Sequence, residues 1–347
     1  MEQLFGIIYH SIGGFSSASF YVPYNGVRKW SWGTYWIVLG FVAWMIMPTI
    51  GGMITSPALW EILSSSAFSA KAWTYAYGFL WGFGGLLAGL GLRYLGLALG
   101  QSICLGVSAI VGTLVPAIMQ DKIALLFTTA SGAVILTGFI ICIAGVACCG
   151  YAGILKDRML SDADKKASVK EFSAVKGFTM ALLGGVLSAC MAFAIMAGAP
   201  IAQQAARAGT EPVFVNIPIF VLALAGGFTS NLIYNLITSF KNKTLGDYSI
   251  RPPKTLARNY FLAWLSGLMW YGQFFFYGMG TTKMGQYDFA SWSIHMAAII
   301  IFSNLWGVVL KEWKAVSKKT KCYLWLGIIA LIISVVLIGA GNKMAGI

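Results

Sequence analysis

The sequence has few charged residues: they make up 10% of its 347 positions, whereas soluble globular proteins contain about 25%. Hydrophobic residues make up 58%, so water cannot solvate most of the folded surface. The sequence also contains no phosphate-binding loop, no Gly-x-Ser-x-Gly turn and no His-Glu-x-x-His helix. These absences argue against a nucleotide-driven pump and an intramembrane hydrolase, and we expect no cofactor and no enzymatic activity.

The sequence also lacks a metal-binding cysteine spacing and has few acidic residues. Cys148 and Cys149 are adjacent, while Cys104, Cys142 and Cys190 fall inside apolar runs. We therefore expect neither a metal site nor a disulfide framework. Acidic residues number 11 against 24 Lys and Arg, which gives a net charge of +13. The cations lie in short joins between apolar runs and not along one basic face, so they indicate membrane orientation and no nucleic-acid partner.

What the sequence does contain is a succession of apolar runs, each close to the roughly 20 residues needed to cross a bilayer. We predict an all-α integral membrane protein with ten transmembrane helices, over 3–22, 34–56, 72–92, 97–119, 133–154, 177–200, 213–239, 258–280, 287–310 and 322–342. The first run has no Lys or Arg before it, so we expect a retained helix and no signal peptide. The 13 Trp and 15 Tyr suit aromatic belts in contact with membrane lipid.

Lys and Arg are distributed unevenly over the joins between these runs. Nineteen of the 24 fall in the joins that follow odd-numbered helices. Because cytoplasmic joins carry the excess of Lys and Arg, we place these joins in the cytoplasm and both termini on the outer, periplasmic side. The polar join 156–176 is then a cytoplasmic connector between two five-helix halves, 1–155 and 177–347.

Two pattern matches indicate that these halves are repeats. The pattern Gly-Gly-x-x-Ser-Ala occurs at 13–18 and again at 184–189. Trp81 is followed by Gly91 and Gly96, and the same spacing recurs at Trp270, Gly280 and Gly285. Because five is an odd number, equal halves must have opposite orientations, as in the inverted repeats of many transporters. Close packing through small residues is the simpler explanation of the same glycines.

Several longer motifs are shared with one transporter family. They are 20–24, 27–32, 92–96, 267–271, 273–277, 286–288, 291–292, 295–296 and 308–313. In these motifs the chain resembles the bacterial L-rhamnose–proton symporters of the drug/metabolite transporter superfamily. The resemblance implies ten helices in two inverted halves, and proton-driven import of L-rhamnose, or a close 6-deoxy sugar, across the bacterial inner membrane.

Ionisable groups inside a bilayer are costly and are therefore functional candidates. Asp288, Ser291, Trp292 and His295 lie three, four and seven residues apart and so share one helical face. Partial desolvation favours a protonated carboxyl group, and we predict that Asp288 carries the coupled proton. Helix capping is the alternative role. His295 and His10 are the other proton-coupling candidates, with a structural hydrogen bond as the alternative for each.

Sugar binding needs aromatic plates beside amide and hydroxyl groups, and Trp270, Gln273 and Tyr277 offer these on one helical face. Plain aromatic packing is the alternative for this face. The remaining substrate-binding candidates are Ser291, Trp292, Gln101, Asn231 and Tyr21, with helix-to-helix hydrogen bonds as the alternative for Gln101 and Asn231.

We therefore predict a secondary transporter that imports L-rhamnose with protons. An exporter of drugs or metabolites built on the same fold is the alternative, and the lack of a carboxylate in the first helix after Glu2 argues against export of cationic drugs. A membrane sensor or scaffold without flux is a second alternative.

Overall fold

The architecture comes from a computed structural model, which describes residues 2–95, 97–159 and 173–345. Within these ranges every regular element is a helix. The long helices are α1 (Glu2–Ser19), α2 (Trp32–Phe41), α3 (Met47–Thr55), α5 (Phe68–Leu95), α6 (Leu97–Met119), α8 (Ala130–Arg158), α10 (Ala174–Ser188), α11 (Cys190–Ala197), α12 (Ala199–Arg207), α13 (Ile217–Asn242), α14 (Pro253–Thr281), α15 (Ser291–Val309) and α16 (Lys318–Met344). Shorter helical pieces are η1 (Val22–Gly26), η2 (Val42–Ile46), α4 (Leu59–Ser65), α7 (Leu125–Thr128), η3 (Pro212–Phe214), η4 (Leu245–Ser249) and η5 (Gly285–Ala290).

Seven helical segments of the described ranges are long and apolar enough to cross a membrane. They are Trp32–Thr55, Phe68–Leu92, Ala130–Arg158, Val175–Arg207, Pro212–Asn242, Gly285–Val309 and Lys318–Met344. Each of the ten predicted runs overlaps a helix, but α1 and α14 fall outside this set, and α6 contributes only the shorter apolar stretch Ile103–Met119. The protein is thus an all-helical, multi-pass membrane protein, and ten spans stay a prediction. The predicted connector lies mostly outside the described residues.

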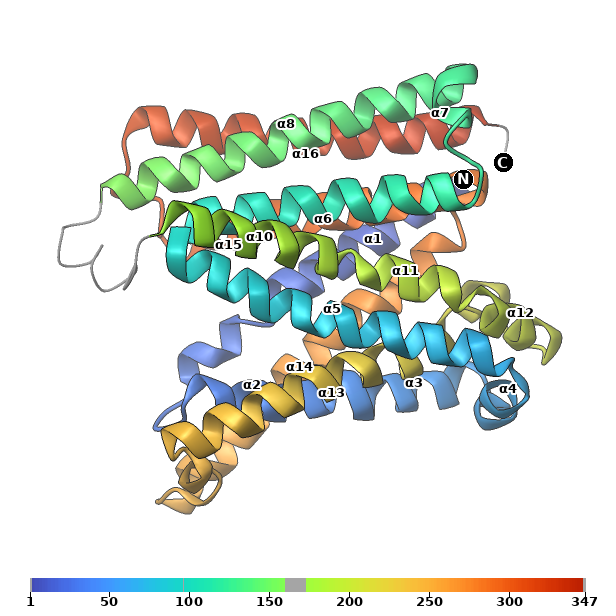
Figure 1. Ribbon diagram of the computed structural model, residues 1–347. Coiled ribbons are helices and arrows are strands. Elements are labelled where there is room, and N and C mark those ends of the chain that lie inside the picture. Colours follow the sequence, from blue (N-terminus) through green and yellow to red (C-terminus); the bar gives the residue numbers. More distant parts are fainter. Residues whose placement is uncertain (1, 96, 160–172, 346–347) are drawn as a thin grey trace.

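The helices form one elongated bundle (Figure 1). Helices α8 and α16 lie side by side along one edge, and α2, α3, α13 and α14 lie at the opposite edge (Figure 1). Between them, α1 packs against α14 and α15, while α10 packs against α5 and α6. The start of α1 and the end of α16 lie at the same end of the bundle as α4, α7 and α12 (Figure 1). We call this the terminal end, and the other the connector end.

Short side chains allow the α8–α16 pair to approach closely. A methyl group added at Gly145 would lie 2.9 Å from Leu331 Cγ, and one added at Gly327 would lie 2.5 Å from Cys149 Sγ. Small residues give such contacts in lipid, where no hydrophobic force drives helices together. The first residue of each helix is also fixed by a hydroxyl cap: the Thr129 hydroxyl accepts from Gly132 N, and the Ser317 hydroxyl accepts from Thr320 N.

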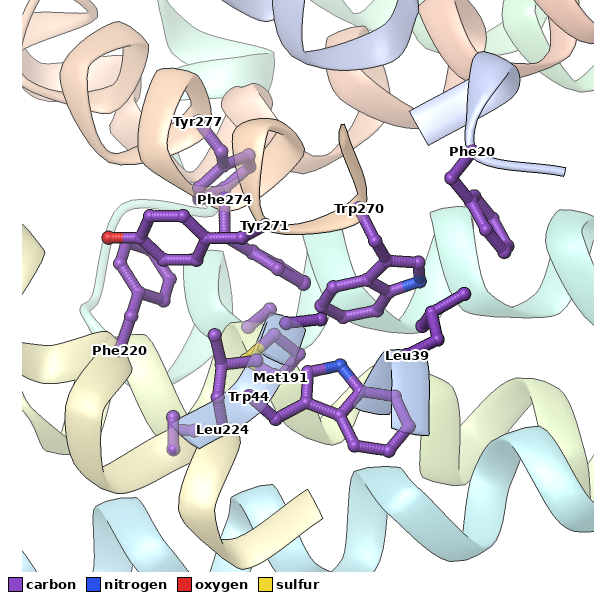
Figure 2. Packing of buried hydrophobic residues seen from close by; sticks show 14 of the residues in the cluster. Phe20, Leu39, Trp44, Met191, Phe220, Leu224, Trp270, Tyr271, Phe274 and Tyr277 are labelled. Atoms are coloured by element: carbon purple, nitrogen blue, oxygen red, sulfur yellow. The ribbon is translucent and has the colours of Figure 1, made fainter. Parts of the chain in front are cut away.

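An aromatic core lies among α2, η2, α13 and α14, and Figure 2 shows its side chains packed against one another. Trp270 of α14 meets Trp44 at 5.3 Å between ring centroids and Trp81 at 5.7 Å. Trp44 lies on η2, a π-helical turn within the continuous helix formed by α2, η2 and α3. Pro48 explains this turn, because proline has no N–H to donate to the carbonyl of Trp44 and its ring crowds that carbonyl.

Candidate functional site

A cavity of about 780 Å³ extends from the terminal end into the bundle. Its walls come from α6 on one side, α11 and α12 on the other, and the end of α14 with η5. Exposed Gln203 lies at its rim, and Gly112 and Tyr277 line its deeper part. The polar residues that line it include Gln120, Gln203, Asn216, Tyr277, Thr281, Thr282 and Asp288. A sugar-sized solute therefore has access from the terminal end.

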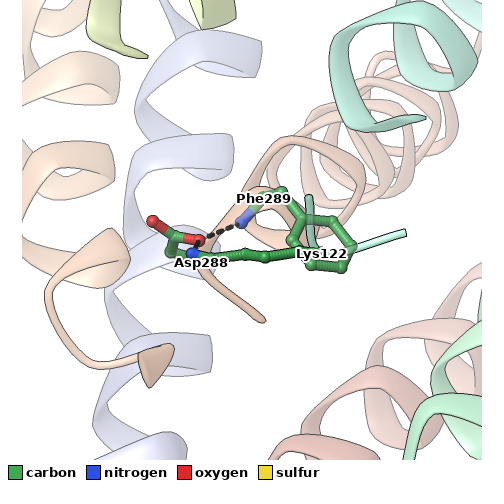
Figure 3. Close-up of polar contacts among 3 residues, drawn as sticks. All are labelled: Lys122, Asp288 and Phe289. Carbon is green, nitrogen blue, oxygen red and sulfur yellow. Dashed lines mark hydrogen bonds and ion pairs between the residues drawn. The ribbon is translucent and has the colours of Figure 1, made fainter. Parts of the chain in front are cut away.

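Asp288 lines this cavity and forms an ion pair with a residue that sequence reasoning missed. Its Oδ1 accepts a hydrogen bond from Lys122 Nζ at 2.7 Å and from the backbone N–H of Phe289 at 2.9 Å (Figure 3). The side chains of Lys122 and Asp288 are 25% and 36% exposed, so the pair adds at most about 1 kcal/mol of stability. Its importance is positional, because it joins the turn after α6 to η5.

The capping role considered for Asp288 is not realised in the structure. Residue Ala290 occupies the N-cap of α15, and no side chain accepts a hydrogen bond there. Asp288 bonds instead to the N–H of its immediate neighbour, Phe289, within η5.

His10 and His295 lie together behind Tyr277. Both imidazoles are fully buried, and their ring centroids are 6.1 Å apart. The Tyr277 ring lies 5.2 Å from His10 and 5.1 Å from His295. None of the four imidazole nitrogens makes a hydrogen bond within the described ranges. The chain thus holds two unpaired histidines one aromatic ring away from the cavity, although α1 and α15 are far apart in sequence.

Two further candidates on α15 are buried beside this cluster. Trp292 lies 5.8 Å from the Tyr277 ring, and its Nε1 donates to the carbonyl of Ser108 at 3.0 Å. The Ser291 hydroxyl is buried and has no partner among the residues described. Neither residue lines the cavity, so in this conformation a solute would meet Tyr277 first.

Trp270 and Gln273 are also buried below the cavity floor. Trp270 packs within the aromatic core, 5.4 Å from Phe274 (Figure 2). The backbone of Gln273 lies close to α1, because its main-chain carbonyl oxygen would lie 2.8 Å from a methyl group added at Gly13. Packing accounts for Trp270 in this conformation.

The structure places the other three candidates away from the cavity. Gln101 is exposed near the start of α6. Asn231 connects helices, because its Oδ1 accepts from Trp36 Nε1 at 3.1 Å and its Nδ2 donates to the carbonyl of Gly82 at 3.3 Å. Tyr21 is 50% exposed at the connector end, where it stacks on Trp32.

Sequence reasoning also missed several cavity walls. Gln203 lies in the stretch Ala199–Arg207, which is too polar to face acyl chains. Gln120 and Lys122 follow α6 at a point where few cations occur on that side. Polar residues at these helix ends could have indicated the cavity, because uncharged amide side chains are unfavourable where a helix faces lipid.

Comparison with known proteins identifies the family. A family model described as L-rhamnose-proton symport protein (RhaT) matches residues 2–345. The chain belongs to this family. It is 36% identical over 342 residues to an L-rhamnose-proton symporter of Yersinia pestis (strain Pestoides F), covering 97% of this chain and 98% of that protein. It is 37% identical over 340 residues to one of Cronobacter sakazakii (strain ATCC BAA-894), covering 97% of each. Membership of the symport protein family makes the chain a transport protein and not an enzyme.

Proposed function

We propose that this protein imports L-rhamnose, or a close 6-deoxy sugar, together with protons across a bacterial inner membrane. The family and the names of its relatives support this substrate pair. The observation that carries the proposal is the cavity at the terminal end, with Tyr277 at its floor, Asp288 in its wall and the two buried histidines behind it. The positive joins at the connector end favour a cytoplasmic position for that end, so the cavity opens outward.

We also propose that the bundle consists of ten spans in two inverted halves, as in the drug/metabolite transporter superfamily. Helix packing supports this proposal. In the first half α1 packs against α14 and α15, the eighth and ninth spans, and in the second half α10 packs against α5 and α6, the third and fourth. An inverted repeat exchanges these two sets, since the first span corresponds to the sixth and the third to the eighth.

The repeated glycines occupy corresponding contacts, which supports the same proposal. Added methyl groups would lie 2.8 Å from Gln273 O at Gly13 and 2.5 Å from Ala298 Cβ at Gly14. In the second half, an added methyl group at Gly184 would lie 2.6 Å from the backbone nitrogen of Ala88 on α5. The other glycine of this second pattern, Gly185, approaches α6 closely as well, because a methyl group added there would lie 2.7 Å from the carbonyl oxygen of Cys104.

The proposed cycle begins with sugar and proton entering from outside. The proton neutralises Asp288 and releases Lys122, which weakens the link between the turn after α6 and η5. The sugar contacts Tyr277 first, and Trp270, Gln273, Ser291 and Trp292 become available when the halves rock about the binding site. His10 and His295 serve as polar partners or proton carriers at the same level. Gln101, Asn231 and Tyr21 remain candidates only for a later, inward-facing step.

Asp288→Asn tests the coupling role. The amide keeps the size of the side chain but cannot carry the proton, so we expect loss of rhamnose accumulation driven by an inward pH gradient. Exchange of internal for external rhamnose, which needs no net proton movement, should persist. Glu2→Gln is the matched control, because Glu2 pairs with Lys283 at the same end without lining the cavity. Full coupling in Asp288→Asn would show that the proton binds elsewhere.

A second assay separates import of a sugar from export of another solute. Binding of L-rhamnose, other 6-deoxy sugars, hexoses and lipophilic cations is compared on the purified protein. We expect L-rhamnose or a close 6-deoxy sugar to bind most tightly. Tight binding of the cations and none of the sugars would favour the exporter instead.

A further inference from the structure

The outer cavity separates two helices that belong to different halves. Gly112 and Pro116 of α6 lie on one side, and Ala192 and Ile195 of α11 lie on the other. The proposed inverted repeat, on which this inference rests together with rhamnose transport, maps α6 onto α15 and α10–α12 onto α1 with the residues after it. The counterpart of the outer cavity at the connector end therefore lies between the ends of α1 and α15.

In the structure this position is closed by a chain of contacts. Trp306 Nε1 donates to Ser19 Oγ at 2.8 Å, and the Ser19 hydroxyl donates to the carbonyl of Phe15 at 2.7 Å. The Phe15 ring stacks on Trp306 at 6.3 Å and meets Phe302 edge-on at 5.4 Å. Ser19 is only 1% exposed. The ends of α1 and α15 are thus joined by a hydrogen bond and by contacts between aromatic rings. Their counterparts in the repeat, α10–α12 and α6, are separated by the outer cavity.

A second set of contacts at the connector end corresponds, through the repeat, to contacts that are intact at the terminal end. The carboxylate of Asp247 in η4 accepts from Ser31 N at 2.7 Å, and so joins the segment before α2 to the segment before α14. The repeat relates this junction to the segments after α12 and α3, where Thr210 Oγ1 donates to Ser56 Oγ at 3.1 Å. That outer junction stays made while the outer cavity is open. By the same symmetry, the Asp247–Ser31 junction stays made when the inner path opens.

We propose that the sugar leaves toward the cytoplasm between α1 and α15, and that Ser19 and Trp306 close this release path. Opening requires the hydrogen bond and the stacked rings to separate as one unit. The segments before α2 and α14 move together during this step.

Cross-linking at the two junctions tests the assignment. One variant carries Ser19→Cys with Trp306→Cys, and its matched control carries Lys29→Cys with Arg251→Cys, where the Lys29 ammonium reaches the carbonyl of Arg251 at 3.2 Å. Both are made with Cys322→Ser, because Cys322 is exposed. A flexible bifunctional thiol reagent should arrest rhamnose uptake in the first variant while external rhamnose still binds, and it should leave uptake unchanged in the second. Unchanged uptake in the first, or arrest in the second, overturns the proposal.

A milder change keeps the test sound where the double variant folds poorly. Trp306→Phe retains a ring to stack on Phe15 but removes the N–H donor. Loss of one net hydrogen bond from the closed state shifts the equilibrium constant between the outward-open and inward-open states by about fivefold toward the inward-open state. The inward-open population should rise by up to that factor, and apparent affinity for external rhamnose should fall in proportion to the outward-open population that is lost. A rise in affinity, or an unchanged affinity together with an unchanged rate of labelling from the cytoplasmic face, contradicts the gating role of the bond.

A third measurement needs no substrate and so separates failure of the release path from failure of rhamnose transport. Ser17→Cys, a buried position of α1 that leaves the Ser19–Trp306 bond intact, is labelled with a membrane-impermeant thiol reagent in inside-out vesicles, with Cys322→Ser as background. Trp306→Phe should speed labelling from the cytoplasmic face. Equal labelling rates would overturn the path even for a different substrate, whereas faster labelling without rhamnose uptake would reject only the sugar assignment.

Discussion

Replacing His295 with leucine should keep or raise the stability of the protein while it lowers transport. The imidazole is fully buried, and neither ring nitrogen has a partner within the described ranges. A buried polar group without a partner costs about 1–3 kcal/mol, while a hydrophobic side chain of similar volume and different shape costs less than about 1.5 kcal/mol. His295→Leu should therefore unfold at the same temperature as the wild type or a few degrees higher. If the imidazole carries the proton, uptake should fall by about 10-fold or more, because hydrogen bonds to charged groups contribute about 1.5–3 kcal/mol. If it only bonds the uncharged sugar, uptake should fall by about 2- to 12-fold, the range for one neutral hydrogen bond.

The assay pairs thermal unfolding of purified protein in detergent with rhamnose uptake in proteoliposomes. Tyr35→Phe is the control, for which we expect the opposite result. The buried Tyr35 hydroxyl donates a hydrogen bond to Ser266 Oγ at 2.6 Å, and neither residue lines the cavity. Its loss should lower stability by about 1 kcal/mol with little effect on uptake. Normal uptake by a stabilised His295→Leu protein would refute a transport role for this residue. Joint loss of stability and uptake would assign it to structure.

Two other predictions concern the repeat and the cavity floor. Gly14→Leu should destabilise the fold by about 1–3 kcal/mol, because even a methyl group at this position would lie 2.5 Å from Ala298 Cβ. Gly89→Leu is the control and should be tolerated, because an added methyl group there meets nothing within 4 Å. Equal melting temperatures of the two variants would contradict the close approach at Gly14. Tyr277→Phe should raise the KM for L-rhamnose by about 2- to 12-fold, the range for one neutral hydrogen bond, with the maximal rate little changed; an unaltered KM would remove the Tyr277 hydroxyl from the binding site.

The positions of the helices followed from the sequence because lipid imposes a simple demand. Every backbone polar group must be satisfied within the bilayer, so a long apolar run has to be helical. The caps at Thr129 and Ser317 and the proline at position 48 are local features that a sequence also displays. By contrast, the breaks in the sixth predicted run, at Ala189 and Gly198 between α10, α11 and α12, were not foreseen. Pro200 in the first turn of α12 is a local cause of the second break, because proline cannot donate the backbone hydrogen bond that would continue the helix.

The candidate site was predicted in part, for a related reason. Helical periodicity put Asp288 and His295 on one helical face, but the structure places Asp288 in η5, before α15 begins at Ser291, so Asp288 does not share the α-helical spacing of that face. Periodicity also placed Tyr277 on a polar-aromatic face, and Tyr277 lines the cavity. Periodicity gave no information on which helices adjoin, so the contact of His10 with His295 and the pairing of Lys122 with Asp288 needed the structure. Asn231 shows the converse case, because a polar residue in an apolar span also serves to hold helices together.

Simultaneous measurement of the two fluxes tests the central claim most directly. Purified protein is reconstituted in lightly buffered proteoliposomes without an imposed gradient, and L-rhamnose is added outside while external pH and entry of labelled sugar are recorded. Proton symport predicts that the external pH rises in step with rhamnose entry and that a protonophore abolishes the rise without stopping entry. Entry of rhamnose with no change in external pH would contradict proton coupling, and absence of entry would contradict rhamnose import itself.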